Sequence, residues 1–179
     1  PTNVYWGDTH LHTNLSLDAN YLGNKRLGPD EAYRFAKGET VVSSTGLDAR
    51  LQRPLDFLVV ADHASNMGIV KALIDEDPNL LKSNWGKQAV AAWNEKRLNL
   101  FYDGVVGDKS YRTSIWESVA QSADKHNDPG KFTALIGYEW TQLFYNLHRV
   151  VIYKDSAVKV SSFLPFSQYD SDDPEDLWA

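Results

Sequence analysis

Two kinds of hydrophobic pattern alternate along the chain. Short apolar runs rich in β-branched and aromatic residues predict strands at Val4–Gly7, Leu55–Ala61, Phe132–Tyr138 and Val150–Tyr153. Longer segments with helical character lie between them, at Pro29–Lys37, Trp85–Tyr102 and Ser114–His126. Strands that alternate with helices predict an α/β fold in which most strands are parallel.

Local signals sharpen parts of this pattern. Leu55–Ala61 is almost continuously apolar, which is typical of a strand buried on both faces of a sheet. Pro29 and the two acids after it predict a helix start, and Gly38 predicts its end. The polar stretch Asp75–Asn84 predicts a surface connection. The segment Tyr169–Glu175, with four acids and a proline, predicts a solvated loop.

The composition predicts a single folded domain. The chain has 179 residues, 42% of them hydrophobic, and its mean hydropathy of -0.44 is ordinary for a folded protein. A net charge of -6 argues against partners that need a basic face, so we expect neither a nucleic acid nor a membrane as partner. No apolar stretch is long enough for a membrane helix.

The chain has no cysteine, which excludes disulfides, thiolate nucleophiles and Cys-ligated metal sites. The lack of cysteine fits the bacterial cytoplasm and the periplasm equally well, so the compartment stays open.

Histidines and acids gather beside the predicted strands. The chain places them at Asp8, His10, His12 and Asp18, at Asp62 and His63, at Glu139, and at His148 and Arg149. In α/β sheets and barrels, functional side chains meet at the carboxyl ends of the strands. We therefore expect these groups to converge on one site.

His10 and His12 are two positions apart on an extended segment, so their side chains point the same way and could hold one metal ion. A single histidine beside a strand is usually a cap or a surface residue. The combination with His63 and Glu139 is what favours a metal site. Imidazole and carboxylate ligands without thiolate suit Zn, Mn or Fe, and a carboxylate can bridge two ions.

Other polar residues are expected in supporting roles. Asp8 and Asp62 are candidates for accepting the remote N–H of a ligand imidazole. His126 lies in a polar run at the end of a predicted helix, where we expect a cation at the surface.

Three motifs resemble those of the PHP (polymerase and histidinol phosphatase) superfamily. The run Gly7-Asp8-Thr9-His10-Leu11-His12-Thr13, followed by Ser16 and Asp18, resembles its first motif. Val59-Val60-Ala61-Asp62-His63 resembles its second motif. Ile136-Gly137-Tyr138-Glu139 resembles the strand that carries its metal-bridging glutamate.

A narrower resemblance is to the uncharacterised bacterial family DUF3604. Four phrases carry it: Tyr5-Trp6-Gly7-Asp8, Ala32-Tyr33-Arg34-Phe35-Ala36-Lys37-Gly38-Glu39, Gly137-Tyr138-Glu139-Trp140-Thr141 and His148-Arg149-Val150-Val151. Together the motifs touch most of residues 4–155.

These resemblances imply the N-terminal part of a distorted (β/α)7 PHP-type barrel with two to three divalent transition metals, Zn, Mn or Fe. By motif, His10 and His12 would hold one ion, and Glu139 would bridge it to a second. Asp18, which stands where many superfamily members have histidine, would help His63 to hold a third. His148 is either a further ligand or a hydrogen-bonded residue that starts the next strand.

The superfamily also carries late histidines, and this chain has none after His148. We therefore expect residues 1–179 to form one PHP-like domain that is incomplete. The rest of the barrel or another chain would cover its C-terminal edge. Leu177 and Trp178 resemble the start of a further element.

The function that follows is a metal-dependent hydrolase, with a phosphoesterase as the first hypothesis. Metal-activated water would attack a small phosphate or other anionic substrate, and Arg149 would bind a substrate oxygen unless it forms only a surface ion pair. A metal-dependent amide or ester hydrolase and a catalytically degenerate PHP-like binding module are the alternatives. This fragment alone could be inactive, because a half-site binds metal poorly.

Overall fold

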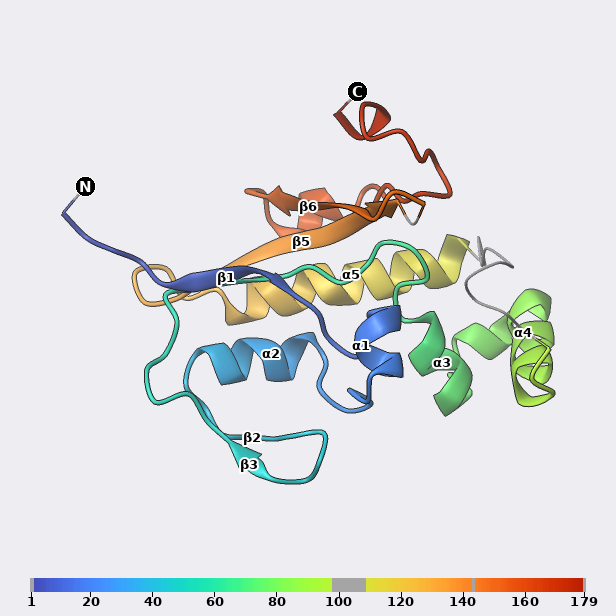
Figure 1. Ribbon diagram of the computed structural model, residues 1–179, viewed down its shortest axis with the longest axis horizontal. Coiled ribbons are helices and arrows are strands. Elements are labelled where there is room, and N and C mark those ends of the chain that lie inside the picture. The colour runs from blue at the N-terminus through green and yellow to red at the C-terminus, as the bar shows by residue number, and fades with distance from the viewer. Residues whose placement is uncertain (1, 98–108, 143, 179) are drawn as a thin grey trace.

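The computed structural model describes residues 2–97, 109–142 and 144–178, which form a mixed α/β fold (Figure 1). The strands are β1 (Gly7–Leu11), β2 (Val41–Val42), β3 (Asp48–Ala49), β4 (Phe57–Val60), β5 (Thr133–Gln142) and β6 (Leu147–Tyr153). The α-helices are α1 (Leu17–Tyr21), α2 (Pro29–Ala36), α3 (Ile69–Asp75), α4 (Asn84–Asn94), α5 (Lys109–His126) and α6 (Ala157–Val160). Short 3-10 helices cover Leu80–Lys82 and Asp176–Trp178.

Four strands form one curled sheet in the order β1-β4-β5-β6. The β1–β4 and β4–β5 pairs are parallel, whereas β5 and β6 pair antiparallel. The prediction of an α/β fold with mostly parallel strands is therefore confirmed. The described residues show a half-barrel of four strands, and the seven-stranded barrel implied by the PHP resemblance stays a prediction.

The apolar sequence of β4 explains its central position in the sheet. It lies inside the predicted run, and Leu58, Val59 and Val60 are fully buried between β1 and β5. Two other predicted runs become longer strands, because β5 continues to Gln142 and β6 begins at Leu147. Glu139 therefore lies within a strand rather than after one.

The prediction of a strand at Val4–Gly7 is wrong. Val4, Tyr5 and Trp6 are exposed, and the ladder with β4 starts only at Gly7, which pairs with Phe57. A side chain at Gly7 would meet Phe57, since a Cβ there would lie 2.3 Å from its carbonyl oxygen. The strand thus occupies the polar motif itself, and His10 lies on β1.

One face of the sheet packs against α2 and α5, which both lie below the strands in Figure 1. Leu58, Val60 and Tyr138 belong to the core between sheet and helices, together with Tyr33 from α2 and Trp116 from α5. The indole of Trp116 also donates to the carbonyl of Val160 at 3.1 Å. This layer leaves the opposite face of the sheet for other side chains.

A second, smaller core joins α3, α4 and the start of α5, to the right in Figure 1. Most of Asp75–Asn84 is exposed, as expected of a surface connection, but Leu80 within it is fully buried in this second core. The predicted helix at Trp85–Tyr102 is confirmed by α4 for its first part, and its last residues, from 98 onward, lie outside the described residues.

The C-terminal segment returns to the main core. Phe166 and Leu177 pack against that core, while Asp172, Asp173 and Glu175 are exposed, as expected of a solvated loop.

Within the described ranges, none of the helices has both the length and the apolar character needed to cross a bilayer.

Candidate metal centre

Six side chains from four strands and one helix meet at one end of the sheet. His10 lies on β1 and His12 directly follows it, Asp18 lies in α1, and His63 follows β4. Glu139 and His148 lie on β5 and β6. The structure thus brings together the six residues that the sequence predicts as metal ligands, at the distances given below.

Backbone pairing explains how these residues reach one another. The β1–β4 register shifts between Asp8 and Leu11, which bends β1 where His10 lies. Beyond β4, His63 continues as an isolated bridge opposite Glu139. The amide of Ala64 donates to the Glu139 carbonyl at 2.8 Å, which holds the His63 backbone beside that strand.

Glu139 is the centre of the cluster, and its side chain is completely buried. Its Oε2 atom lies 2.9 Å from Nε2 of His12, 3.0 Å from Nδ1 of His63 and 3.2 Å from Nε2 of His10. Its Oε1 atom contacts Nδ1 of His148. Burial raises the pKa of Glu139, but the surrounding imidazoles, His12 first, outweigh it and lower the pKa to about 2.

Asp18 is a second carboxylate beside the same histidines, and its side chain is about half exposed. Its carboxylate lies 3.0 Å from Nδ1 of His12 and 3.6 Å from Nε2 of His63, and it accepts a hydrogen bond from Ser16 at 2.6 Å. Burial raises the pKa of Asp18, but these contacts lower it well below its usual range. The carboxylate is therefore charged at neutral pH.

His12 stands between the two carboxylates. Burial lowers the pKa of His12, but its contacts with Asp18 and Glu139 outweigh that effect and raise the pKa to about 10. Without a metal ion, His12 therefore carries a proton at neutral pH.

The cluster contains three overlapping groups whose ligand atoms lie within 4.8 Å of one another, and each could hold a metal ion. They are His10, His12 and Glu139; His12, Asp18 and His63; and His63, Glu139 and His148.

Two buried atoms in the cluster show whether its side chains are suited to bind a cation. Nε2 of His12 and Oε2 of Glu139 are buried 2.9 Å apart as an ion pair, and within the described residues neither atom makes a hydrogen bond of good geometry. Buried polar atoms in native structures are almost always partnered. A divalent cation would satisfy both, since imidazole and carboxylate are common metal ligands. The residues present thus fit a metal centre, and they do not single out one metal.

Arg149 is not brought to the cluster. It follows His148 on β6, and adjacent strand residues point to opposite faces, so its side chain leaves the face on which Glu139 lies. Its guanidinium donates to the carbonyl of His148 at 2.8 Å.

Two acids differ from their predicted supporting roles. Asp8 accepts from the backbone N–H of His10 at 2.7 Å rather than from an imidazole. Asp62 is fully buried and accepts from the backbone and the hydroxyl of Thr13, the latter at 2.6 Å. Burial raises the pKa of Asp62 to about 6. Both carboxylates therefore stabilise the backbone around the histidines.

His126 is also placed differently from its prediction. It is only 6% exposed, its ring stacks on Tyr33 at 5.5 Å, and its Nε2 lies 2.8 Å from Asp30. The polar residues around it in sequence hid this burial, because His126 lies on the side of α5 that α2 covers.

Two residues to which the sequence assigned no role also touch the cluster. The hydroxyl of Thr141 lies 2.7 Å from Nδ1 of His63, and the amide oxygen of Asn146 lies 2.8 Å from Nε2 of His148. Thr141 sits two positions after Glu139, on the same face of β5, which is the signal that could have identified it.

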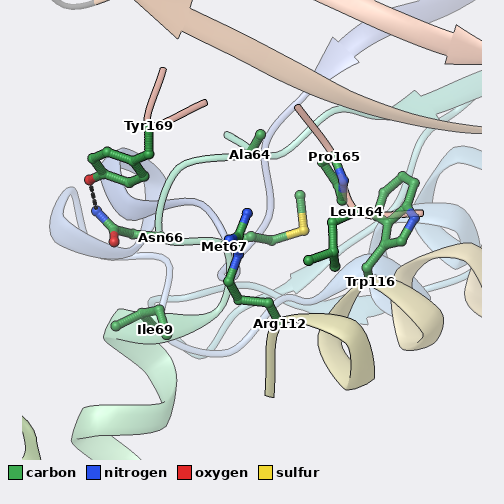
Figure 2. A pocket seen from close by; sticks show the side chains of 9 residues that line it. All are labelled: Ala64, Asn66, Met67, Ile69, Arg112, Trp116, Leu164, Pro165 and Tyr169. Atoms are coloured by element: carbon green, nitrogen blue, oxygen red, sulfur yellow. Dashed lines mark hydrogen bonds between the residues drawn. The ribbon is translucent and has the colours of Figure 1, made fainter. Parts of the chain in front are cut away.

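A small cavity lies behind the loop that follows His63 (Figure 2). Met67, Arg112 and Trp116 line it, and the amide of Asn66 donates to the Tyr169 hydroxyl across one end at 2.9 Å. Its free volume of about 20 Å³ has room for a water molecule but not for a substrate. The cavity is therefore not part of the candidate site.

Comparison with protein families identifies a family that matches the chain. The family described as "Protein of unknown function (DUF3604)" matches residues 1–102 and 87–179, which together span the chain. Neither a curated protein nor a solved structure shows a significant match.

Proposed function

Because the chain belongs to the DUF3604 family, whose function is unknown, we propose its activity from its site: a metal-dependent hydrolase that acts on phosphoesters. The observation that supports this proposal is the convergence of four imidazoles on one buried carboxylate, Glu139. The site would be of the PHP type, on the N-terminal strands of a PHP-like barrel.

The proposed ligand assignment follows the contacts. His10 and His12 would hold one ion, Glu139 would be shared between that ion and a second one at His148, and Asp18 and His63 would hold a third. Zn, Mn and Fe suit these donors.

Divalent ions at these residues would lower the pKa of a coordinated water and neutralise the charge of a phosphate group. The protein's own groups prepare the site for them. Glu139 and Asp18 are ionised at neutral pH, because their pKa values are lowered, and so they provide the negative charge that attracts cations. His12 must release its proton before its Nε2 can act as a ligand.

The strand framework keeps these groups in place. Glu139 is fixed on β5, where it pairs with Val150 of β6 on one side and with His63, just after β4, on the other. Asp62 ties the segment that carries His12 to the end of β4 through Thr13. Preorganised ligands of this kind bind ions and substrates without large rearrangement.

The test is hydrolysis of an aryl phosphate and of an aryl carboxylic ester by the protein, first stripped of metal and then reloaded with Zn or Mn. Glu139→Gln keeps the shape of the side chain and removes its charge. Glu117→Gln is the matched control, since Glu117 lies on α5. We expect phosphate hydrolysis that needs metal, and a loss of at least about 100-fold in Glu139→Gln only.

Hydrolysis of the carboxylic ester alone would instead identify an ester hydrolase. The proposal fails if no substrate is turned over in a metal-dependent way, which would leave a binding module. It also fails if Glu139→Gln is as active as the control.

A further inference from the structure

In a neutral histidine, one ring nitrogen donates a hydrogen bond and the other can bind a metal ion. A neutral imidazole carries one N–H and one lone pair, and only the lone pair can bind a metal ion. The group that accepts the N–H therefore decides which nitrogen faces the ion. In this cluster, His63 and His148 each have an oxygen partner that makes this choice.

In His148, Asn146 determines which ring nitrogen carries the hydrogen. The amide oxygen of Asn146 lies 2.8 Å from Nε2, and a carbonyl oxygen can only accept. With the hydrogen on Nε2, the lone pair lies on Nδ1, which contacts Oε1 of Glu139. Both of these atoms then offer electron pairs, as two ligands of one metal ion do.

In His63 the hydrogen lies on Nδ1 instead of Nε2. Nδ1 lies 2.7 Å from the hydroxyl of Thr141 and 3.0 Å from Oε2 of Glu139. The hydroxyl of Thr141 is able to accept a hydrogen bond, so a neutral His63 can place its hydrogen on Nδ1. The contact with the carboxylate does not decide the tautomer, because an ion can lie between a ring nitrogen and a carboxylate. The lone pair then lies on Nε2, the nitrogen that faces Asp18 at 3.6 Å.

We propose that Thr141 and Asn146 are positioning residues that direct His63 and His148 to two different metal ions. Thr141 turns the lone pair of His63 toward the ion at Asp18, and Asn146 turns that of His148 toward the ion at Glu139. The inference rests on the proposed metal centre. It also separates the overlapping ligand groups, because the nitrogen of His63 that lies 3.0 Å from Glu139 is Nδ1, which carries the hydrogen in this tautomer.

The fold explains why these residues can act in this way. Thr141 is buried and pairs with His148 across β5 and β6, so its hydroxyl is held on the face of the cluster. Asn146 occupies the left-handed backbone region, with φ of 51°, in the turn that leads into β6. Asparagine tolerates this conformation, which places its side chain over His148.

The experiment compares zinc binding and histidine tautomers in four variants of the chain. Thr141→Val removes the hydroxyl with little change of shape, and Thr141→Ser keeps it. Asn146→Gly removes the amide and accepts the positive φ, and Asn146→Asp keeps an accepting oxygen. Thr133→Val, at the other end of β5, is the control. Zinc affinity is measured by titration, and the ring tautomers by 15N NMR of the zinc form.

We expect the zinc form of the wild type to carry the ring hydrogen on Nδ1 in His63 and on Nε2 in His148. Thr141→Val and Asn146→Gly should each weaken the binding of one zinc ion by roughly 10- to 100-fold. Thr141→Ser, Asn146→Asp and Thr133→Val should bind as the wild type does.

The opposite tautomers, or wild-type affinity in both Thr141→Val and Asn146→Gly, would overturn this inference and leave the metal centre standing. A wild type that binds no zinc would overturn the proposed function and the inference together.

Discussion

Nε2 of His12 lies 2.9 Å from Oε2 of Glu139 as a buried ion pair, and within the described residues neither atom makes a hydrogen bond of good geometry. The two residues come from opposite sides of the central strand β4, since His12 follows β1 and Glu139 lies on β5. The contact therefore forms only when β1, β4 and β5 are paired in register. A cation bound by both groups would replace the proton of His12 as the positive partner of Glu139.

The zinc affinity of the protein should rise with pH. The pKa of His12 is raised to about 10 in the metal-free protein, so between pH 6 and 8 a zinc ion must displace its proton. Each displaced proton makes the affinity about tenfold higher per pH unit. Competition titrations against a chelator of known pH dependence measure this slope. A zinc affinity that is constant over the range would contradict the prediction.

Asp62 should make the metal-free fold less stable as the pH rises from about 4 to 6. Its pKa in the fold is raised to about 6 by burial, so the folded protein favours the protonated form. The stabilisation that this form provides is lost as the carboxyl ionises. Asp62→Asn stays neutral, so the free energy of unfolding of the wild type relative to this variant should fall by about 2–3 kcal/mol.

Urea unfolding in the presence of a chelator, at pH 4 and at pH 7, measures that difference for the wild type and Asp62→Asn. If the two proteins keep the same difference in stability at both pH values, Asp62 does not titrate in this range and the prediction is wrong.

Gly137→Ala should damage both stability and the site. A Cβ at Gly137 would lie 2.5 Å from Cγ1 of Val59 and 2.9 Å from the carbonyl oxygen of Val151, so the neighbouring strands would have to move. Overpacking of this kind destabilises by about 1–3 kcal/mol. Because Glu139 follows two positions later on the same strand, zinc affinity should fall as well. Unfolding midpoints and zinc titrations equal to those of the wild type would show that the strands adapt.

The sequence predicted best what depends on burial. The continuous apolar run around Val59 predicted a strand covered on both faces, and the structure places β4 there. The apolar run Val4–Gly7 has a similar composition, but it forms no strand before Gly7. A strand needs a hydrogen-bonded neighbour as well as apolar residues, and only Gly7 onward meets β4. The neighbour cannot be read from the local pattern.

In the candidate site, too, the sequence predicted which residues converge but not the contacts that depend on strand pairing. The positions of His10, His12, His63 and Glu139 beside apolar runs were enough to predict their convergence. The contacts of Thr141 and Asn146 depend on the antiparallel pairing of β5 with β6, whereas the sequence predicted mostly parallel strands. Asp62 was expected to bind an imidazole, but the backbone N–H of Thr13 lies nearer. Such details follow from strand register, which local pattern does not determine.

Glu139 should matter more for metal binding than His148. Its carboxylate faces both proposed ions and carries negative charge, whereas His148 is a neutral ligand at one of them. Glu139→Gln should therefore bind at least one zinc ion fewer than the wild type. His148→Ala should retain the ion at His10 and His12, and weaken only the one that it contacts.

The most direct test of the metal centre is the number of zinc ions bound by the purified chain, measured by elemental analysis after equilibration with zinc and removal of the excess. We predict two to three zinc ions in the wild type and a loss of at least one in Glu139→Gln, with Glu117→Gln unchanged. A wild type that binds no zinc, or a Glu139→Gln variant that binds as many ions as the wild type, would contradict the assignment of Glu139 as the centre of a metal site.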